Sequence, residues 1–346
     1  MKVLVTGGCG FIGSNFIYYM LRTYNDIVIT NLDKLTYAGN LENLERAHKD
    51  YGPRLTFVKG DILDSKLVSE VMAQKFDVVI NFAAESHVDR SIEDSSEFLK
   101  TNILGTRTLL EAFRRSGGLF IQISTDEVYG SLGHEGKFTE CCPLAPNSPY
   151  AASKAAADLL VQAYAHTFNL PVIITRCSNN YGPYQFPEKL IPLMISNAIE
   201  GKRLPVYGDG RNVRDWIFVE DHVCAIDLIM RSGKPGQVYN IGGDCEKRNL
   251  DLLHELLAEM ECQLNLPSQH FHHLITFIAD RPGHDLRYAM DFSILAKELN
   301  WRPKYSFEEG LKATVAWYIE NKAWWTRIKS GEYIHYYDRM YKHRLA

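Results

Sequence analysis

Short apolar runs alternate with longer stretches of helical spacing through the first half of the chain. Six runs rich in β-branched residues predict strands at 2–5, 26–30, 55–58, 78–82, 119–123 and 172–175. Stretches of helix length lie between them, for example 96–115 and 150–168. Apolar strands that alternate with helices are typical of a parallel sheet covered on both faces. The pattern therefore predicts an α/β fold, a Rossmann-type doubly wound parallel sheet.

The pattern changes after about residue 178, where proline and glycine become frequent. We expect residues 1–177 to form the Rossmann domain, and residues 178–346 to form mainly a smaller α/β domain that is interleaved with the first. Loops and short elements should make up much of the smaller domain. An apolar run at 236–243 is typical of a buried strand that can return to the main sheet. The aromatic and basic tail at 324–346 predicts a packed C-terminal segment.

Charge and hydropathy narrow the range of partners. The 346 residues carry a formal net charge of -4. Nucleic-acid binders usually show a clear basic excess, so no nucleic-acid partner is expected. No apolar run reaches the roughly 18 residues that a membrane span needs, and no targeting segment is visible, so no membrane partner is expected.

The cysteines and histidines give no sign of a metal or disulfide framework. The seven cysteines are odd in number and scattered along the chain, which favours reduced thiols in a cytoplasmic protein. The cluster His270-x-His272-His273 is the one grouping that invites a metal. Because no carboxylate or cysteine stands at a useful spacing from it, we expect no metal there.

A glycine-rich turn follows the first predicted strand and opens a helix. Gly7, Gly10 and Gly13 match G-x-x-G-x-x-G, and Gly8 completes an overlapping G-x-G-x-x-G. Such glycines let the backbone approach a pyrophosphate at the N-terminus of the helix. Asp33 stands 20 residues past Gly13, where a carboxylate accepts hydrogen bonds from a ribose 2′-OH and repels a 2′-phosphate. The motif therefore predicts NAD rather than NADP, and residues 1–177 become the NAD-binding domain.

Tyr150 and Lys154 form Tyr-x-x-x-Lys, a spacing that places both side chains on one face of a helix. A free tyrosine has a pKa near 10, about three units too high for a base at neutral pH. An adjacent ammonium stabilises the phenolate and should lower that pKa. The pair can then remove a proton from a sugar hydroxyl while hydride leaves the same carbon for NAD.

The run Thr125-Asp126-Glu127 comes directly after the strand at 119–123. Functional side chains of open parallel sheets gather beyond the carboxyl ends of the strands. Thr125 can hydrogen-bond the hydroxyl that is oxidised. Two adjacent acids in different environments can serve as one acid and one base. The alternative is that Asp126 caps a turn and Glu127 is solvated.

These residues together resemble the dTDP-glucose 4,6-dehydratases of the extended short-chain dehydrogenase/reductase type. Further runs similar to that family are Asn81–Ser91, Cys177–Pro183, Phe186–Pro192 and Asp280–Asp285. The resemblance covers nearly the whole chain and implies an NAD-dependent hydro-lyase. Tyr150 would take the proton from O4, Glu127 the proton at C5, and Asp126 would protonate the departing C6 hydroxyl. The product would be dTDP-4-keto-6-deoxyglucose, and NAD would stay tightly bound and be regenerated in each turnover.

The resemblance also implies which residues hold the ligands. On the cofactor side they are Gly7, Gly10, Phe11, Ile12, Gly13, Asp33, Lys34, Thr36, Asp61, Ile62, Phe82, Ala83, Ala84, Ser86, Thr101, Tyr150, Lys154 and Asn180. On the substrate side they are Ser86, Thr125, Asn179, Lys189, Leu190, Pro205, Tyr207, Arg214, Asn249, Arg281, His284 and Tyr288. The arginines and lysine suit a nucleoside diphosphate because they donate several charged hydrogen bonds. A surface turn is the alternative for Asp61.

The same resemblance implies a homodimer through helices near 96–115 and 150–168. Those helices would then carry apolar residues on a second face. Candidates for that face are Leu109, Leu110, Phe113, Leu159, Leu160 and Ala163.

Three alternatives stay open. The first is a 4,6-dehydratase of UDP-glucose or another nucleotide sugar, because thymine and uracil differ by one methyl group, worth about 1–3 kcal/mol at most. The second is a UDP-sugar 4-epimerase, which the Asp126-Glu127 pair disfavours, since an epimerase has no C6 leaving group to protonate. The third is a catalytically idle nucleotide-sensing relative, which would be expected to lose Tyr150 or Lys154.

Overall fold

The structure of the protein, a computed structural model, describes residues 1–330 and 337. Its largest element is a seven-stranded sheet in the order β10-β6-β5-β4-β1-β2-β3, with every neighbouring pair parallel. The strands are β1 (Lys2–Thr6), β2 (Val28–Asp33), β3 (Leu55–Lys59), β4 (Val78–Asn81), β5 (Leu119–Thr125), β6 (Val172–Cys177) and β10 (Val238–Ile241). The six strands expected in the first half of the chain and the parallel Rossmann-type sheet are therefore confirmed.

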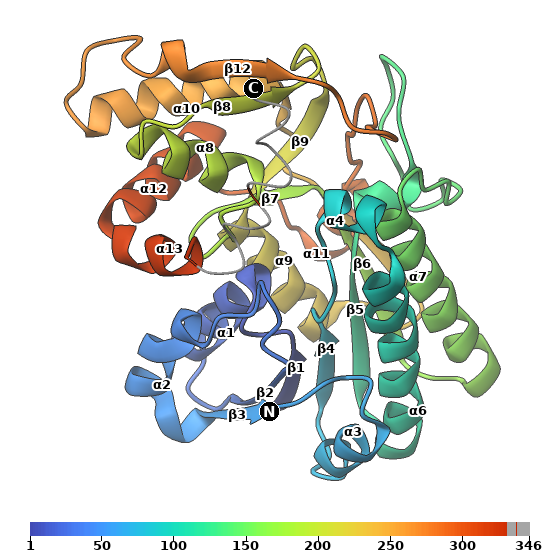
Figure 1. Ribbon diagram of the computed structural model, residues 1–346. Coiled ribbons are helices and arrows are strands. Elements are labelled where there is room, and N and C mark those ends of the chain that lie inside the picture. Colours follow the sequence, from blue (N-terminus) through green and yellow to red (C-terminus); the bar gives the residue numbers. More distant parts are fainter. Residues whose placement is uncertain (331–336, 338–346) are drawn as a thin grey trace.

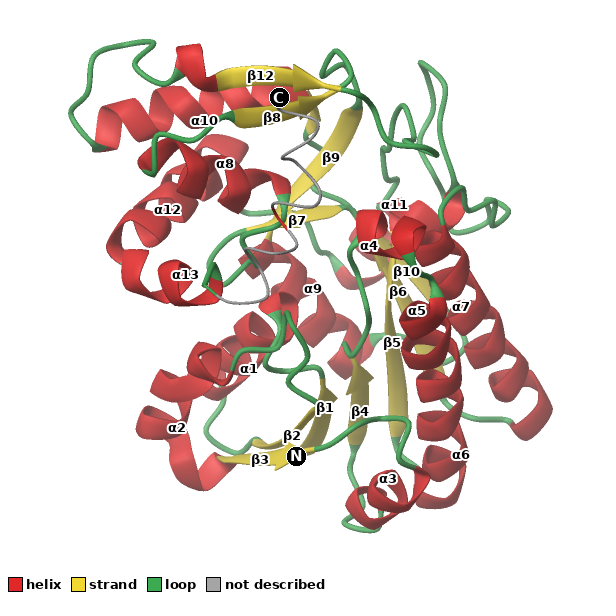
Figure 2. Ribbon diagram, in the orientation of Figure 1, coloured by secondary structure: helices red, strands yellow, loops and turns green. Residues whose placement is uncertain are grey.

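Helices cover both faces of this sheet (Figure 2). One face packs against α1 (Phe11–Thr23), α2 (Glu45–Tyr51), α9 (Val219–Ser232) and α11 (Ser293–Leu299). The other face packs against α3 (Ser65–Met72), α6 (Thr106–Ser116) and α7 (Pro149–Phe168). Because both faces are buried, the central strands read as continuous apolar runs rather than as alternating ones.

The helix expected at 96–115 is made of three joined pieces. They are α5 (Ser96–Phe98), a π-helical stretch at Leu99–Gly105 and α6. A shorter helix, α4 (Val88–Glu93), precedes them above the carboxyl end of β4. Of the apolar residues expected on a second helix face, Leu109, Leu110 and Phe113 are instead buried in the core against the sheet. That part of the expectation was wrong, because these three residues form the inward face of α6.

A second body sits above the carboxyl ends of the large sheet (Figure 1). It contains a three-stranded sheet of β7 (Asn179–Tyr181), β9 (Val213–Phe218) and β11 (Glu246–Arg248), and the pair β8 (Leu204–Tyr207) and β12 (Ile275–Ile278). Its helices are α8 (Leu190–Ile199), α10 (Asn249–Gln263), α12 (Phe307–Glu320) and α13 (Lys322–Ile328). Four short 3-10 turns complete the described elements, at Leu41–Leu44, Gly52–Arg54, Asp126–Tyr129 and His272–Leu274.

The expectation that loops and short elements dominate after residue 178 was wrong. Helices α10 and α12 have 15 and 14 residues, and they enclose an apolar core of their own. Leu252, Leu253, Leu256, Leu257 and Met260 recur at helical spacing in α10 and are all buried. The prolines and glycines that suggested loops lie largely in the turns between these helices and the short strands.

The chain crosses between the two bodies more than once. After β9, helix α9 packs against α1, and β10 then pairs with β6 at the edge of the large sheet. Of the aromatic tail, Trp324 and Trp325 are buried in the second core, whereas 331–336 and 338–346 lie outside the described residues. None of the helices in the described part of the chain combines the length and hydropathy that crossing a membrane requires.

Candidate active site

Two adjoining cavities lie at the carboxyl ends of the parallel strands. The first, of about 300 Å³, runs along the edge of the large sheet, and the second, of about 180 Å³, lies under the second body. Four residues line both cavities: Glu127, Asn179, Glu188 and Lys189. In open α/β sheets this edge is where ligands bind.

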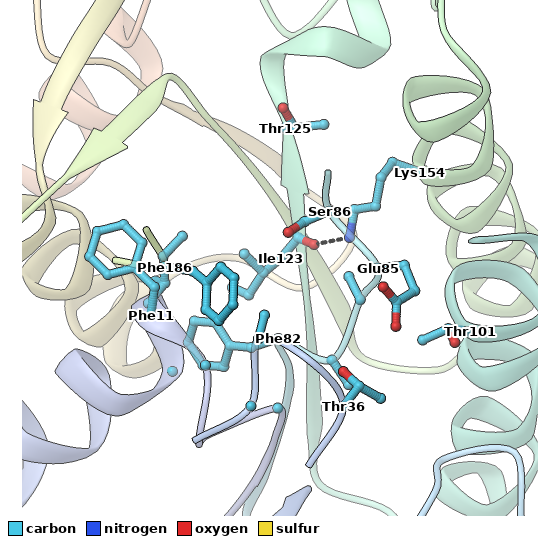
Figure 3. Close-up of a pocket in the computed structure, with 18 of the residues that line it drawn as sticks. Phe11, Thr36, Phe82, Glu85, Ser86, Thr101, Ile123, Thr125, Lys154 and Phe186 are labelled. Atoms are coloured by element: carbon cyan, nitrogen blue, oxygen red, sulfur yellow. Dashed lines mark hydrogen bonds between the residues drawn. The ribbon is translucent and has the colours of Figure 1, made fainter. Parts of the chain in front are cut away.

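Every residue predicted for the cofactor side lines the first cavity. Those are Gly7, Gly10, Phe11, Ile12, Gly13, Asp33, Lys34, Thr36, Asp61, Ile62, Phe82, Ala83, Ala84, Ser86, Thr101, Tyr150, Lys154 and Asn180. Figure 3 shows Phe11, Phe82 and Phe186 at one side of this cavity, with Ser86 and Lys154 across from them. The cavity thus offers an apolar wall opposite a polar one.

The glycine turn is held so tightly that side chains would not fit. Gly7 has a φ of +70°, and a Cβ there would lie 2.6 Å from the backbone nitrogen of Ala83. A Cβ on Gly13 would lie 2.5 Å from the carbonyl oxygen of Gly7. Helix α1 begins at once after the turn, and its N-cap, Gly10, has no side chain to satisfy the first N–H groups. A bare helix N-terminus lined by backbone fits the pyrophosphate of a dinucleotide.

Asp33 is fixed at the end of β2. Its two carboxylate oxygens accept hydrogen bonds from the N–H groups of Cys9 and Leu35, each at 2.8 Å. Burial raises the pKa of Asp33, and these hydrogen bonds act in the opposite direction. Nearby, the Lys34 ammonium lies 2.8 Å from a carboxylate oxygen of Asp61. The two acids therefore define one end of the cavity, where the motif predicts an adenosine.

The predicted Tyr-x-x-x-Lys pair stands at the start of α7. Ser148 caps this helix by accepting a hydrogen bond from the N–H of Ala151, and Pro149 occupies its first turn. Both Tyr150 and Lys154 are buried and line the first cavity. The Lys154 ammonium donates a 2.6 Å hydrogen bond to the carbonyl oxygen of Ile123 in β5, which Figure 3 draws as a dashed line.

The pKa of Tyr150 does not follow the sequence-based expectation. Burial raises it well above 10, and the neighbouring carboxylate of Glu127 adds to the rise. Burial also lowers the pKa of Lys154. Among the causes of the shift only the hydrogen bond with Thr125 lowers the pKa of Tyr150, and removal of the phenol from water outweighs it.

The adjacent acids Asp126 and Glu127 have different surroundings. Asp126 accepts a 3.0 Å hydrogen bond from the hydroxyl of Thr125 through one oxygen, while its other oxygen is buried without a partner. Burial, and then the charge of Glu127, raise the pKa of Asp126 well above its ordinary value of 3.8.

Burial also raises the pKa of Glu127, but Arg281, Lys189 and Arg214 act against that rise. Glu127 is only partly buried, and it lines both cavities at the place where they meet. The pair has the unequal environments that allow one acid to keep its proton and the other to lose it.

Nine of the twelve residues predicted for the substrate side line the second cavity. They are Asn179, Lys189, Leu190, Pro205, Tyr207, Arg214, Asn249, Arg281 and His284. Ser86 and Thr125 line the first cavity instead. Tyr288 lines neither, because its ring lies under the Arg214 guanidinium at 4.4 Å and its hydroxyl donates to Asp285.

Sequence reasoning missed several residues that line these cavities. Asp89, Glu188 and Trp216 line the second one, and Glu85 and Gln185 line the first. Asp89 and Glu188 stand inside runs that carry the family resemblance, yet nothing in the spacing assigns them a role. Their neighbours in space come from distant parts of the chain, which only the folded structure reveals.

The histidines at 270–273 gather no metal-binding set. Within the part of the chain that the structure describes, no group of three or more His, Cys, Asp or Glu side chains is arranged to hold a metal ion. The ring of His272 stacks on that of His254 at 5.3 Å, and His273 hydrogen-bonds the carbonyl of His270. These side chains take part in local contacts at the edge of the second body.

Comparisons with known proteins agree with this geometry. The family model described as "GDP-mannose 4,6 dehydratase" matches residues 4–314. The chain is 50% identical to a dTDP-glucose 4,6-dehydratase of Neisseria meningitidis serogroup B, over 96% of this chain and 97% of that protein. Among solved structures, it is similar to a dTDP-glucose 4,6-dehydratase from Bacillus anthracis in complex with NAD. That structure has a TM-score of 0.85 and 50% identity, over 95% of this chain and 100% of the other.

A second solved structure is similar at the same coverage, 95% and 100% of the two chains. It is a dTDP-glucose 4,6-dehydratase from Streptomyces venezuelae with NAD and TYD bound, with a TM-score of 0.89 and 48% identity. Relatives named for dTDP-glucose thus match this chain over nearly its full length, whereas the GDP-mannose description belongs to the broader family model.

Proposed function

The chain belongs to the family of dTDP-glucose 4,6-dehydratases, and we propose that it converts dTDP-glucose to dTDP-4-keto-6-deoxyglucose and water. One observation carries the proposal beyond family membership. Thr125, Asp126, Glu127, Tyr150 and Lys154 all line one cavity, at the point where it meets the second. A sugar that reaches from the second cavity toward these side chains would meet a base, an acid and a hydrogen-bond donor together.

The cofactor is proposed to be NAD, held by the glycine turn, Asp33 and the apolar wall of the first cavity. NAD, when bound, would supply the hydride acceptor for C4 of the sugar and, once reduced, the hydride donor for C6. Its positively charged nicotinamide would also oppose the burial that raises the pKa of Tyr150. Because the hydride returns within one turnover, the cofactor should stay on the enzyme.

The side chains of this protein supply the proton transfers. Tyr150 takes the proton from O4, with Lys154 beside it as the cation. The ketone at C4 acidifies C5, and Glu127 takes the proton from C5. Asp126, whose pKa lies well above its ordinary value, gives its proton to the C6 hydroxyl as it leaves. When hydride reaches C6, Glu127 returns its proton to C5, and the proton taken up by Tyr150 restores Asp126 before the next turnover. Each such transfer is typically worth 10²–10⁴-fold in rate, roughly, when the group is positioned.

The acid pair favours elimination over epimerisation. A 4-epimerase needs only the base and the cofactor, since hydride leaves and returns at the same carbon. A second carboxyl group with a raised pKa beside Glu127 has a use only when a hydroxyl must depart. Asp126 is buried, accepts from Thr125 and has no other partner for its second oxygen, so it does not serve as a turn cap.

The nucleotide would be bound by the second cavity. Lys189, Arg214 and Arg281 line it, and they match the charge of a diphosphate. Leu193, Met194, Val206 and Leu253 give the same cavity an apolar part suited to a pyrimidine ring. A methyl group on that ring is worth about 1–3 kcal/mol, which limits how strongly thymine can be preferred over uracil.

A homodimer is proposed from the family and from two exposed apolar side chains. The proposed location of this dimer is the cytoplasm. Leu104, just before α6, is 49% exposed and Leu159 on α7 is 56% exposed. Both lie on neighbouring helices that cover one face of the sheet, and Ala163 continues the exposed face of α7. A second copy of the same surface would cover them. The expected state is a dimer by light scattering, and Leu159→Asp should shift it toward monomer.

The direct test is turnover without added cofactor. The purified protein is incubated with dTDP-glucose and, in parallel, with UDP-glucose. The masses of the sugar nucleotides are then measured by mass spectrometry. Loss of one water from dTDP-glucose, with little from UDP-glucose, is expected. Loss of water from UDP-glucose in preference would assign a different nucleotide. No mass change in either tube, even after NAD is supplied, would exclude the proposed reaction.

A further inference from the structure

Asp89 joins two residues of the nucleotide cavity that come from distant segments. It is the second residue of α4, is almost fully buried and lines the second cavity. One carboxyl oxygen accepts a 3.2 Å hydrogen bond from Nη1 of Arg281, which is 192 residues away. The other accepts a 3.0 Å hydrogen bond from the hydroxyl of Tyr207 at the end of β8. A single side chain thus connects α4, β8 and the loop that carries Arg281.

The three cations of this cavity are held in different ways. The Lys189 ammonium donates to the backbone carbonyl of Ser86 at 2.7 Å, and the Arg214 guanidinium donates to the carbonyls of Val213 and Asp285. Of these three, only Arg281 has a carboxylate within 4.0 Å among the described residues, and that carboxylate is Asp89. Its Nε is buried and has no hydrogen-bond partner among the residues that the structure describes.

Arg281 also lies on the least regular support of the three. Lys189 immediately precedes α8 and Arg214 lies in β9, whereas Arg281 is in a stretch without helix or strand between β12 and α11. Arginine has many rotamers, and immobilising such a side chain opposes binding unless it is already in place. A buried carboxyl group that grips one end of the guanidinium removes that cost beforehand.

We propose that Asp89 is a positioning residue that holds Arg281 ready for the diphosphate of the nucleotide. This inference rests on the proposed function only for the identity of the nucleotide. Asp89 takes no part in the proton transfers, which occur at Asp126, Glu127 and Tyr150. Its removal should therefore weaken nucleotide binding and raise KM while kcat changes little.

Calorimetry of dTDP binding to the protein as purified tests this role. Asp89→Asn keeps the size of the side chain and removes its charge, and it should weaken dTDP binding roughly 10- to 30-fold. Binding of thymidine, which lacks the diphosphate, should change much less. Asp89→Glu should recover part of the affinity. Asp209→Asn is the matched control, because Asp209 pairs with Arg211 on the exposed surface, and its dTDP affinity should equal that of the wild type.

A double-mutant cycle separates positioning from a general structural role. If Asp89 acts through Arg281, then Asp89→Asn should add little to the loss already caused by Arg281→Met. An equal loss in both backgrounds, or an affinity for dTDP that is unchanged or tighter in Asp89→Asn, would overturn the proposal. If Asp89→Asn does not fold, Asp89→Glu in the same cycle gives the same decision.

The outcome is distinguishable from a failure of the proposed function. Binding of dTDP and of UDP can be measured without any turnover. A wild-type protein that binds either nucleotide but dehydrates neither sugar would contradict the proposed reaction. The double-mutant cycle would still decide the role of Asp89. A wild-type protein that binds neither nucleotide would overturn both.

Discussion

The two cavities of this protein are built from different materials. The first is lined along its phosphate-binding edge by backbone, where Gly7, Gly10 and Gly13 lie within one turn of the chain. The second is lined by side chains from α4, β8, β9, α8, α10 and a loop, and one hydrogen bond in its wall joins residues 192 positions apart. The phosphate-binding edge of the first cavity is thus a local feature of a single βα unit, whereas the second cavity exists only once both bodies have packed together.

This difference separates what each region can tolerate. A backbone cradle has no spare room, so a single added methyl group must displace main chain. A cradle of side chains can lose one member and keep the others, so its changes should act on affinity by degrees. Mutations in the two cavities should therefore impair the protein in different ways. Mutations where the cavities meet should have a third kind of effect.

The largest effect is expected where the cavities meet. Tyr150→Phe removes the proposed base and leaves the ring in place, so kcat should fall by about 10³-fold or more while NAD and dTDP still bind. Turnover of dTDP-glucose, followed by mass spectrometry, together with the NAD content of the purified variant, measures both quantities.

A matched control is Tyr164→Phe, further along α7. The Tyr164 hydroxyl donates a 2.6 Å hydrogen bond to Glu111, and neither residue lines either cavity. Its loss should leave turnover near the wild-type value. A Tyr150→Phe enzyme with more than a tenth of the wild-type rate would remove Tyr150 as the base.

The backbone cradle is tested by Gly13→Ala. The new Cβ would lie 2.5 Å from the carbonyl oxygen of Gly7, so either the turn or the helix must shift. We expect NAD to be lost on purification and activity to fall by about 100-fold, by analogy with the cost of misplacing bound groups by about 1 Å. Absorbance of released cofactor and activity with NAD added back measure this.

Gly133→Ala serves as the control, because a Cβ at that position meets nothing within 4 Å. It should retain bound NAD and full activity. Full retention of NAD in Gly13→Ala would show that the glycine turn can shift to accept a Cβ, which contradicts the proposed contrast between the two cavities.

A graded loss is expected in the side-chain cavity. Arg214→Met removes a guanidinium but keeps much of the chain length, and the neighbouring Lys189 and Arg281 remain. KM for dTDP-glucose should rise on the order of 10-fold, with smaller changes in kcat and with NAD still bound, since the lost contact serves binding. Steady-state kinetics at saturating and limiting substrate separate the two parameters.

Arg211→Met is the control, since Arg211 is largely exposed and pairs with Asp209 at the surface. Loss of bound NAD from Arg214→Met would break the comparison, because it would show that the two cavities do not fail independently.

The same contrast explains what the sequence could predict. The phosphate-binding edge of the first cavity is encoded by neighbours in the chain: the glycine spacing, the acid 20 residues later and the strands before them are all local patterns. The six strands and this edge could therefore be predicted from local patterns, whereas most other residues of the cavity were implied by the family resemblance, and Glu85 and Gln185 were missed. Tyr150 and Lys154 could also be predicted as a pair, because two residues four positions apart on a helix lie on the same face.

The parts that could not be predicted depend on long-range packing. In the sequence, nothing distinguishes Asp89 from other acids at the start of a short helix. Its role becomes visible only when β8 and the loop at 280–288 pack against it. The pKa of Tyr150 was predicted in the wrong direction, since spacing reveals the nearby ammonium but not the burial of both groups. Leu109 and Phe113 were assigned to the outer face because apolar periodicity alone does not say which side the sheet occupies.

The smallest expected effect is one of stability at the meeting point. Burial raises the pKa of Asp126 above 3.8, so the folded state holds its proton at pH values where the unfolded chain has released it. The free energy of unfolding then falls as pH rises above 3.8, because the folded state binds more protons than the unfolded one. Asparagine does not titrate, so Asp126→Asn should escape this decline and be more stable than the wild type at pH 8.

The gain should disappear toward pH 4, where Asp126 keeps its proton in the unfolded chain as well. Thermal unfolding of the wild type and of Asp126→Asn across pH 4–8 measures it. Two curves that run parallel over the whole range would mean that Asp126 titrates alike in the folded and unfolded states. In that case Asp126 would be ionised at neutral pH, and it could not supply the proton that the departing hydroxyl needs.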